Sequence, residues 1–203
     1  IPAGAAYFRP TRTDAPTRAF DFLICPSFTL LAFASAVEPL RIANQLSQRP
    51  LYAWRTATVN GQPVTSSCGL TVQVDSALGT PARDAMLVVC AGNQPEKVIT
   101  TALAAAVQRH HRHGGHVAGL CTGPFALAKA GLLTGRRFTL HWENQPVFRE
   151  MFPTLTPSET KYEIDDRILT SGGGAAATDL MIDIIARDQG EAFATMVLDM
   201  CLR

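Results

Sequence analysis

Apolar positions along the chain follow two spacings, one typical of strands and one typical of helices. Residues 85–90 form a continuously apolar run, as expected of a strand buried on both faces of a parallel sheet. Residues 29–48 and 175–186 carry apolar side chains at helical spacing and are predicted to be helices, the first with Pro39 inside it. The same reasoning predicts further strands at 20–25, 52–59, 70–74, 116–120 and 138–140, helices at 95–112, 121–131 and 143–151, and a hairpin of 161–164 and 167–170.

The repeated alternation of strand and helix predicts a flavodoxin-like, three-layer α/β/α sandwich with a mostly parallel sheet. The chain has 203 residues, of which 47% are hydrophobic and 17% charged, so it can bury one substantial core. We expect a flexible tail over 1–19 and a single α/β domain over 20–190. A further helix is expected over 191–203, where the sequence carries no stop signal.

Charge and cysteine content narrow the class of protein. The formal net charge is +1 and no long run of Lys or Arg occurs, so we do not expect this segment to bind DNA directly. The five cysteines are an odd number with no Cys-x-x-Cys pair, which indicates reduced thiols and a cytoplasmic location. Residues 1–19 lack a continuous apolar core, so neither a signal peptide nor contact with a membrane is expected.

Ligands of open parallel α/β sheets collect beyond the carboxyl ends of the strands. That rule selects five turns as the candidate site. They are residues 26–30, 91–93, 120–124, 140–142 and 171–174.

Cys121 is the strongest candidate within these turns. It follows a strand of small residues and precedes a helix, with Gly119 and Gly123 leaving room for a sharp turn that resembles the nucleophile elbow of hydrolases. We expect the thiol to point outward and the helix dipole to favour the thiolate. The alternative is that Cys121 is simply a small buried hydrophobic residue.

Polar residues near Cys121 extend the candidate site. His141 ends the next predicted strand and could supply a base or a hydrogen-bond donor, or could be satisfied by the backbone. Glu143 completes a His-x-Glu pattern that imitates a triad, although an acid in the first turn of a helix is also expected from the helix dipole. Asn93, after Gly92, could offer an amide to a ligand or be ordinary turn chemistry.

Aromatic residues suggest a ligand class. Phe28, Phe33 and Trp142 could form a wall that attracts a cationic or quaternary ammonium ligand, although core packing explains Phe33 equally well.

Two further patterns are weaker. Residues 172–177 formally match Gly-x-Gly-x-x-Ala, but no strand bearing an acid follows, so no dinucleotide cofactor is expected. Residues 110–116 are rich in histidine, but no thiol or carboxylate lies at ligand spacing, so no metal is expected. We interpret these histidines as cations that suit a helix C-terminus.

Three segments together carry a resemblance to a known family: Cys121-Thr-Gly-Pro-Phe-Ala-Leu-Ala-Lys-Ala-Gly-Leu-Leu-Thr-Gly-Arg, Thr139-Leu-His-Trp, and Ser171-Gly-Gly-Gly-Ala-Ala-Ala-Thr-Asp-Leu. They resemble the ThiJ/PfpI branch of the class I glutamine amidotransferase-like superfamily. More narrowly, they resemble the N-terminal domain of AraC-family transcriptional regulators, which residues 28–44 also fit.

The resemblance implies a non-catalytic, ligand-sensing domain that controls a C-terminal helix-turn-helix DNA-binding domain absent from this sequence. It implies a homodimer that contacts DNA only through that missing domain, and a small nitrogenous effector such as betaine, carnitine or arginine. Many catalytic relatives place His directly after the cysteine and Glu early in the first helix, whereas this sequence has Thr122 and the Leu31–Ala32 region there. The expected ligand-binding residues are Cys121, Thr122, His141, Trp142, Asn93, Gly92, Phe28 and Glu38.

Two rival functions remain open at this point. The first is a Cys-His hydrolase, amidase or deglycase that uses Cys121 as nucleophile and His141 as base. The second is redox sensing through Cys121.

Overall fold

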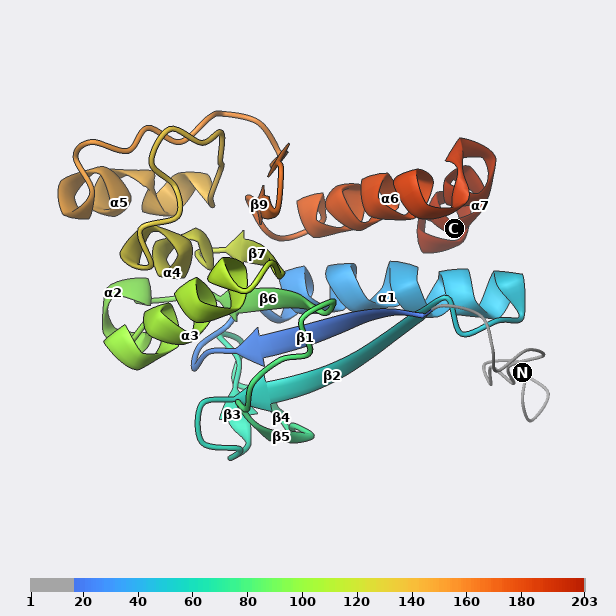
Figure 1. The fold of residues 1–203 in the computed structure, drawn as a ribbon, viewed down its shortest axis with the longest axis horizontal. Coiled ribbons are helices and arrows are strands. Elements are labelled where there is room, and N and C mark those ends of the chain that lie inside the picture. Colours follow the sequence, from blue (N-terminus) through green and yellow to red (C-terminus); the bar gives the residue numbers. More distant parts are fainter. Residues whose placement is uncertain (1–16, 203) are drawn as a thin grey trace.

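A computed structural model describes residues 17–202, with the side chain of Leu202 left out of the description. One seven-stranded sheet forms the middle of the molecule, in the order β5-β2-β1-β6-β7-β9-β8 (Figure 1). Every pairing in it is parallel except that of β8 with β9. The strands are β1 (Arg18–Ile24), β2 (Tyr52–Thr58), β5 (Ser76–Ala77), β6 (Met86–Ala91), β7 (His116–Cys121), β8 (Tyr162–Asp165) and β9 (Ile168–Ser171).

Helices cover both faces of this sheet, and each face has its own apolar core. One core joins α1, α6 and α7 to the sheet, and the other joins α3, α4 and α5 to its opposite face. The predicted three-layer α/β/α sandwich is therefore confirmed. The helices are α1 (Leu30–Ser47), α2 (Pro95–Val98), α3 (Thr101–Arg112), α4 (Pro124–Lys129), α5 (Gln145–Met151), α6 (Ala176–Gln189) and α7 (Glu191–Leu202), with a 3-10 turn η1 (Trp142–Asn144) before α5.

The apolar run predicted to be a central strand is β6, which lies between β1 and β7 and is buried at all six positions. Neighbours on both sides in the sheet and helices above and below leave no solvated face, which explains the absence of polar alternation. The predicted hairpin is also confirmed, since β8 and β9 pair antiparallel, with the turn between them at Asp166 and Arg167.

Three predicted elements are corrected by the structure. Residues 138–140 are extended but form no strand, because the Phe138 carbonyl accepts from Ser158 N and Thr139 N donates to the Thr170 hydroxyl at 2.9 Å. Residues 70–74 contribute only β4 (Thr71–Val72), which pairs with β3 (Val64–Thr65) in a separate two-stranded sheet. The helix predicted over 95–112 is two helices, because Thr100 caps a new N-terminus by accepting from Leu103 N at 3.1 Å.

The predicted domain limits also shift. Residues 1–16 lie outside the described residues, but Arg18 and Ala19 belong to β1 rather than to a tail. α7 packs in the same core as α1 and α6, with Ala194 and Val197 buried, so the helix after residue 190 is part of the same layer. Among the described residues, none of the helices is long and apolar enough to cross a membrane.

Candidate functional site

The five turns selected from the sequence meet at the carboxyl ends of the strands. The residue 26–30 turn reaches the 91–93 turn through an isolated bridge between Phe28 and Gly92. The turn at residues 140–142 joins the 120–124 turn, because His141 N donates to the Cys121 carbonyl at 3.0 Å. The glycine turn after β9 closes the group, since a Cβ added to Gly173 would lie 2.6 Å from the Cys121 Cβ.

Cys121 occupies a strained turn between β7 and α4. Its φ is +59°, a left-handed conformation that residues other than glycine rarely adopt. The chain can turn there because Gly123 and Gly119 leave room: a Cβ on Gly123 would lie 2.3 Å from the Val89 carbonyl oxygen. The predicted elbow is therefore present, and such strain persists where the surrounding structure holds it in place.

The Cys121 thiol does not have the environment that the sequence suggested. Cys121 is only 4% exposed, and the backbones of Gly173 and His141, which line the neighbouring cleft, lie against it. Burial raises the pKa of the Cys121 thiol, although hydrogen bonds from the Thr29 hydroxyl and the Thr122 backbone lower it in part. The expectation of an outward-facing, thiolate-favouring cysteine is therefore wrong, because desolvation outweighs the helix N-terminus.

The groups around the thiol do not form a catalytic relay. The side-chain partner of the Cys121 thiol is the Thr29 hydroxyl, 3.3 Å away, rather than the His141 imidazole. Thr122 is fully buried and donates its hydroxyl proton to the Gly92 carbonyl at 2.7 Å. Glu143 Oε2 lies 3.9 Å from His141 Nδ1, beyond hydrogen-bond distance, and its side chain is mostly exposed.

A cleft of about 500 Å³ opens beside this junction. His141 and Trp142 line one part of it, and His141 Nδ1 is a buried atom without a hydrogen-bond partner among the described residues. Trp142 is 76% exposed and stacks against the His141 ring with 5.8 Å between ring centroids. The cleft is also lined by Gln145, Glu159, Lys161, Gly173 and Ala176.

Several predicted site residues lie elsewhere. Phe28 is fully buried and packs edge-on against Phe33, so these two rings belong to the core and the predicted aromatic wall reduces to Trp142. Asn93 is exposed, but its backbone N–H already donates to the Ser27 carbonyl at 3.0 Å. Glu38 lies well along α1 in an ion pair of 2.8 Å with Arg41, remote from the thiol.

Sequence reasoning missed other residues of the site. Thr29 and Gly173 fall inside two of the selected turns, so the strand-end rule could have found them. Glu159 and Lys161 come from the irregular connection between α5 and β8, where no pattern in the sequence places them near a strand end.

No group of three or more potential metal ligands occurs among the described residues. All five cysteines lie in the described part of the chain and are free thiols.

Comparison with known proteins agrees with this architecture. The model of the DJ-1/PfpI family matches residues 28–187. The chain is 42% identical over 178 residues to the HTH-type transcriptional regulator CdhR of Pseudomonas aeruginosa, which covers 88% of this chain and 53% of that protein. The chain spans about half the length of the curated regulators it matches.

One solved structure and one enzyme are also similar to this chain. The crystal structure of an AraC family transcriptional regulator from Pseudomonas putida superposes with a TM-score of 0.83 at 25% identity, covering 92% of this chain and 100% of that one. The isonitrile hydratase of Pseudomonas putida is 30% identical over 146 residues, covering 66% of this chain and 59% of the enzyme. Because the family model matches most of the chain, the chain belongs to the DJ-1/PfpI family.

Proposed function

We propose that this chain is the ligand-sensing domain of a cytoplasmic AraC-family transcriptional regulator, and that it acts as a homodimer on a separate DNA-binding domain. The named regulators among its relatives support this, as does the coverage of about half their length. A domain of this kind needs a pocket whose occupancy favours one conformation over another, and it needs no chemistry.

The observation that carries the proposal is the cleft around His141 and Trp142. His141 lines the cleft with a partly exposed side chain, so its imidazole can form a hydrogen bond with a ligand there. Trp142 offers a large exposed aromatic face beside it. Such a face attracts cations through its π-system, which suits a quaternary ammonium or guanidinium group.

The charges around the cleft favour a zwitterion. Glu159 can balance a cationic group, whereas Lys161 and the N-terminus of α6 at Ala176 favour a carboxylate. Lys161 is held at this edge by Asp179, 3.4 Å from its ammonium group. An effector with a cationic nitrogen and a carboxylate, such as betaine, carnitine or arginine, would meet both requirements.

The enzyme alternative is not favoured, although the isonitrile hydratase relative shares the family. A nucleophilic cysteine works as the thiolate, and burial raises the pKa of the Cys121 thiol. Its side-chain partner, Thr29, is no base at neutral pH. Recognition without turnover is the function that this geometry supports best.

The test is thermal unfolding of the chain with glycine betaine, carnitine, arginine and, for comparison, uncharged glycerol. A ligand that binds only the folded state raises the apparent Tm. At a hundred times its Kd, it adds about 2.7 kcal/mol to the free energy of unfolding. We expect at least one zwitterion to raise Tm and glycerol to leave it unchanged.

The His141→Ala variant decides whether the cleft is the binding site. We expect it to fold and to lose most of the ligand-induced rise in Tm. If the zwitterions raise Tm equally in the variant, or if none changes Tm in the wild type, the proposal fails.

A further inference from the structure

A second pocket of the described chain lies at the opposite end of the sheet from the candidate site. It has a volume of about 650 Å³, within the roughly 300–1,000 Å³ of typical small-molecule sites. Gly114 lines it just before β7 begins, and Thr80, Pro81 and Arg83 line it just before β6 begins. The six residues of β7 separate the two sites, which is about 20 Å at the rise of a strand.

The charge of this pocket is one-sided. Arg83, Arg109 and Arg112 line it, and no Asp or Glu is among its nine lining residues. Within the described residues, none of these three guanidinium groups forms an ion pair. All three residues are exposed, so their charges are free to meet a ligand from solvent.

Basic residues at a helix C-terminus can have a purely structural role, which is to bond the last carbonyls of the helix. Here other groups already do so. The Arg109 carbonyl accepts from His113 N at 3.1 Å and from His113 Nδ1 at 2.7 Å. The His111 carbonyl accepts from Gly114 N and from Arg167. The end of α3 is therefore capped without the guanidinium group of Arg109, which remains available.

The wall between the cations is rigid and weakly polar. His110 is 5% exposed, and its Nε2–H donates to the Ala85 carbonyl at 2.9 Å. Its ring packs directly over Gly115, where an added Cβ would lie 2.1 Å from His110 Nε2. Pro81 and Ala106 supply apolar surface beside this ring. The histidine-rich segment thus builds a pocket wall rather than a metal site.

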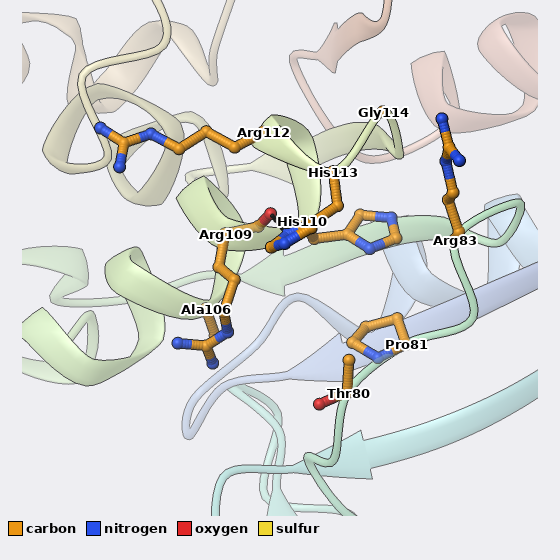
Figure 2. A pocket seen from close by; sticks show the side chains of 9 residues that line it. All are labelled: Thr80, Pro81, Arg83, Ala106, Arg109, His110, Arg112, His113 and Gly114. Carbon is orange, nitrogen blue, oxygen red and sulfur yellow. Dashed lines mark hydrogen bonds between the residues drawn. The ribbon is translucent and has the colours of Figure 1, made fainter.

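Figure 2 shows that Arg83 and Arg109 lie on opposite sides of the pocket, with His110 and Pro81 between them. Arg112 points away from the other two in this view. Cations on two sides of a pocket favour a ligand that carries more than one negative charge. We propose that this pocket binds a small polyanion that carries phosphate or carboxylate groups, held between Arg83 and Arg109.

Phosphate and carboxylate groups share the chemistry that arginine recognises. The experiment therefore measures binding of three probes by isothermal titration calorimetry: pyrophosphate, citrate and ATP. The first two separate phosphate from carboxylate, and ATP adds an apolar ring to the phosphates. We expect at least one probe to bind the wild-type chain at millimolar or lower concentration.

The Arg83→Gln/Arg109→Gln double variant tests the assignment. Because each charged hydrogen bond contributes strongly, we expect its affinity for the bound probe to fall about tenfold or more. The matched control is Arg187→Gln, on α6 at the other face of the sheet, which should bind the probe as the wild type does. Since the pocket shares no residue with the cleft, His141→Ala should also bind normally.

Three results would overturn the proposal. One is that none of the probes binds, and another is that the double variant binds them as well as the wild type. The third is that only a DNA duplex binds through these arginines, which would make the surface a contact for a macromolecule.

Discussion

The two ends of β7 are built by different forces. At its carboxyl end, Cys121 has a positive φ, and Gly173 packs so closely against it that no side chain would fit. At its amino end, Gly114 opens onto a pocket with exposed guanidinium groups that touch no carboxylate of the described chain. Close packing and burial determine the structure at the carboxyl end, whereas the amino end is characterised by positive charges without a carboxylate partner.

This difference shows where stability and function compete. A left-handed non-glycine residue costs about 1–3 kcal/mol, and the turns at the carboxyl ends of the strands include Ser27, Gln94 and Cys121 in this conformation. The amino end has no such strain in its exposed arginines, and removing them should leave the fold intact. Substitutions that crowd the carboxyl end should therefore lower the free energy of unfolding, whereas removing the arginines at the amino end should lower ligand affinity and leave stability nearly unchanged.

The largest expected effect is that of Gly173→Ala. The new Cβ would lie 2.6 Å from the Cys121 Cβ, and φ at this position is +84°. We expect a loss of about 3 kcal/mol in the free energy of unfolding, measured by guanidinium denaturation. Gly131→Ala is the control, because its φ is +73° but no atom lies within 4 Å of the new Cβ, so it should lose only about 1 kcal/mol. Equal losses would show that the packing against Cys121 is loose.

The next effect compares two thiols. Burial raises the pKa of Cys121, whereas a hydrogen bond from Ser66 lowers the pKa of the exposed Cys68. At pH 7.5 we expect iodoacetamide to modify Cys68 at least about tenfold faster, as followed by peptide mass spectrometry. The alkylation rate of Cys121 should keep rising as the pH passes the usual pKa of a cysteine thiol, because the raised pKa of Cys121 delays formation of the thiolate. Faster alkylation or peroxide oxidation of Cys121 at neutral pH would favour the redox-sensing alternative.

Trp142→Ala should affect binding but not folding. Its ring is mostly exposed, so the free energy of unfolding should change by less than about 0.5 kcal/mol. Affinity for a zwitterion that raises Tm should fall about five- to tenfold, because a cation–π contact contributes about 1 kcal/mol. Leu70→Ala, another exposed apolar residue outside the cleft, should leave affinity unchanged. Equal affinities in both variants would remove Trp142 from the site.

The smallest effect is that of the Arg83→Gln/Arg109→Gln variant on stability. Neither arginine forms an ion pair within the described residues, so we expect a change within about 0.5 kcal/mol by the same denaturation assay. A loss of several kcal/mol would mean that these arginines hold the fold together and are not kept for a ligand.

The arrangement of the sheet could be predicted because its signals are local. The apolar run of β6 and the elbow sequence around Cys121 each constrain the backbone directly. The strand-end rule then brought the five turns together without any knowledge of contacts. The strand predicted at residues 138–140 was wrong, because an apolar sequence does not reveal whether its backbone bonds to a strand or to the loop around Ser158.

The chemistry of the site was harder to predict, because it depends on burial. The helix N-terminus after Cys121 favours a thiolate, but the burial of the thiol against the glycine turn at Gly173 is a tertiary property. The same holds for Phe28, whose ring could have turned toward the cleft or the core. The arginine pocket could not be predicted because Arg83 lies in the loop before β6, and nothing local in the sequence brings it to the basic end of α3.

The central claim is that the elbow has been kept for recognition and not for turnover. The most direct measurement is a steady-state assay of the purified chain on isonitrile, amide and glyoxal substrates, with the isonitrile hydratase relative as positive control and Cys121→Ala as blank. We predict that the wild-type chain and the Cys121→Ala variant give indistinguishable rates on every substrate. Turnover that disappears in Cys121→Ala would contradict it and would make the chain an enzyme.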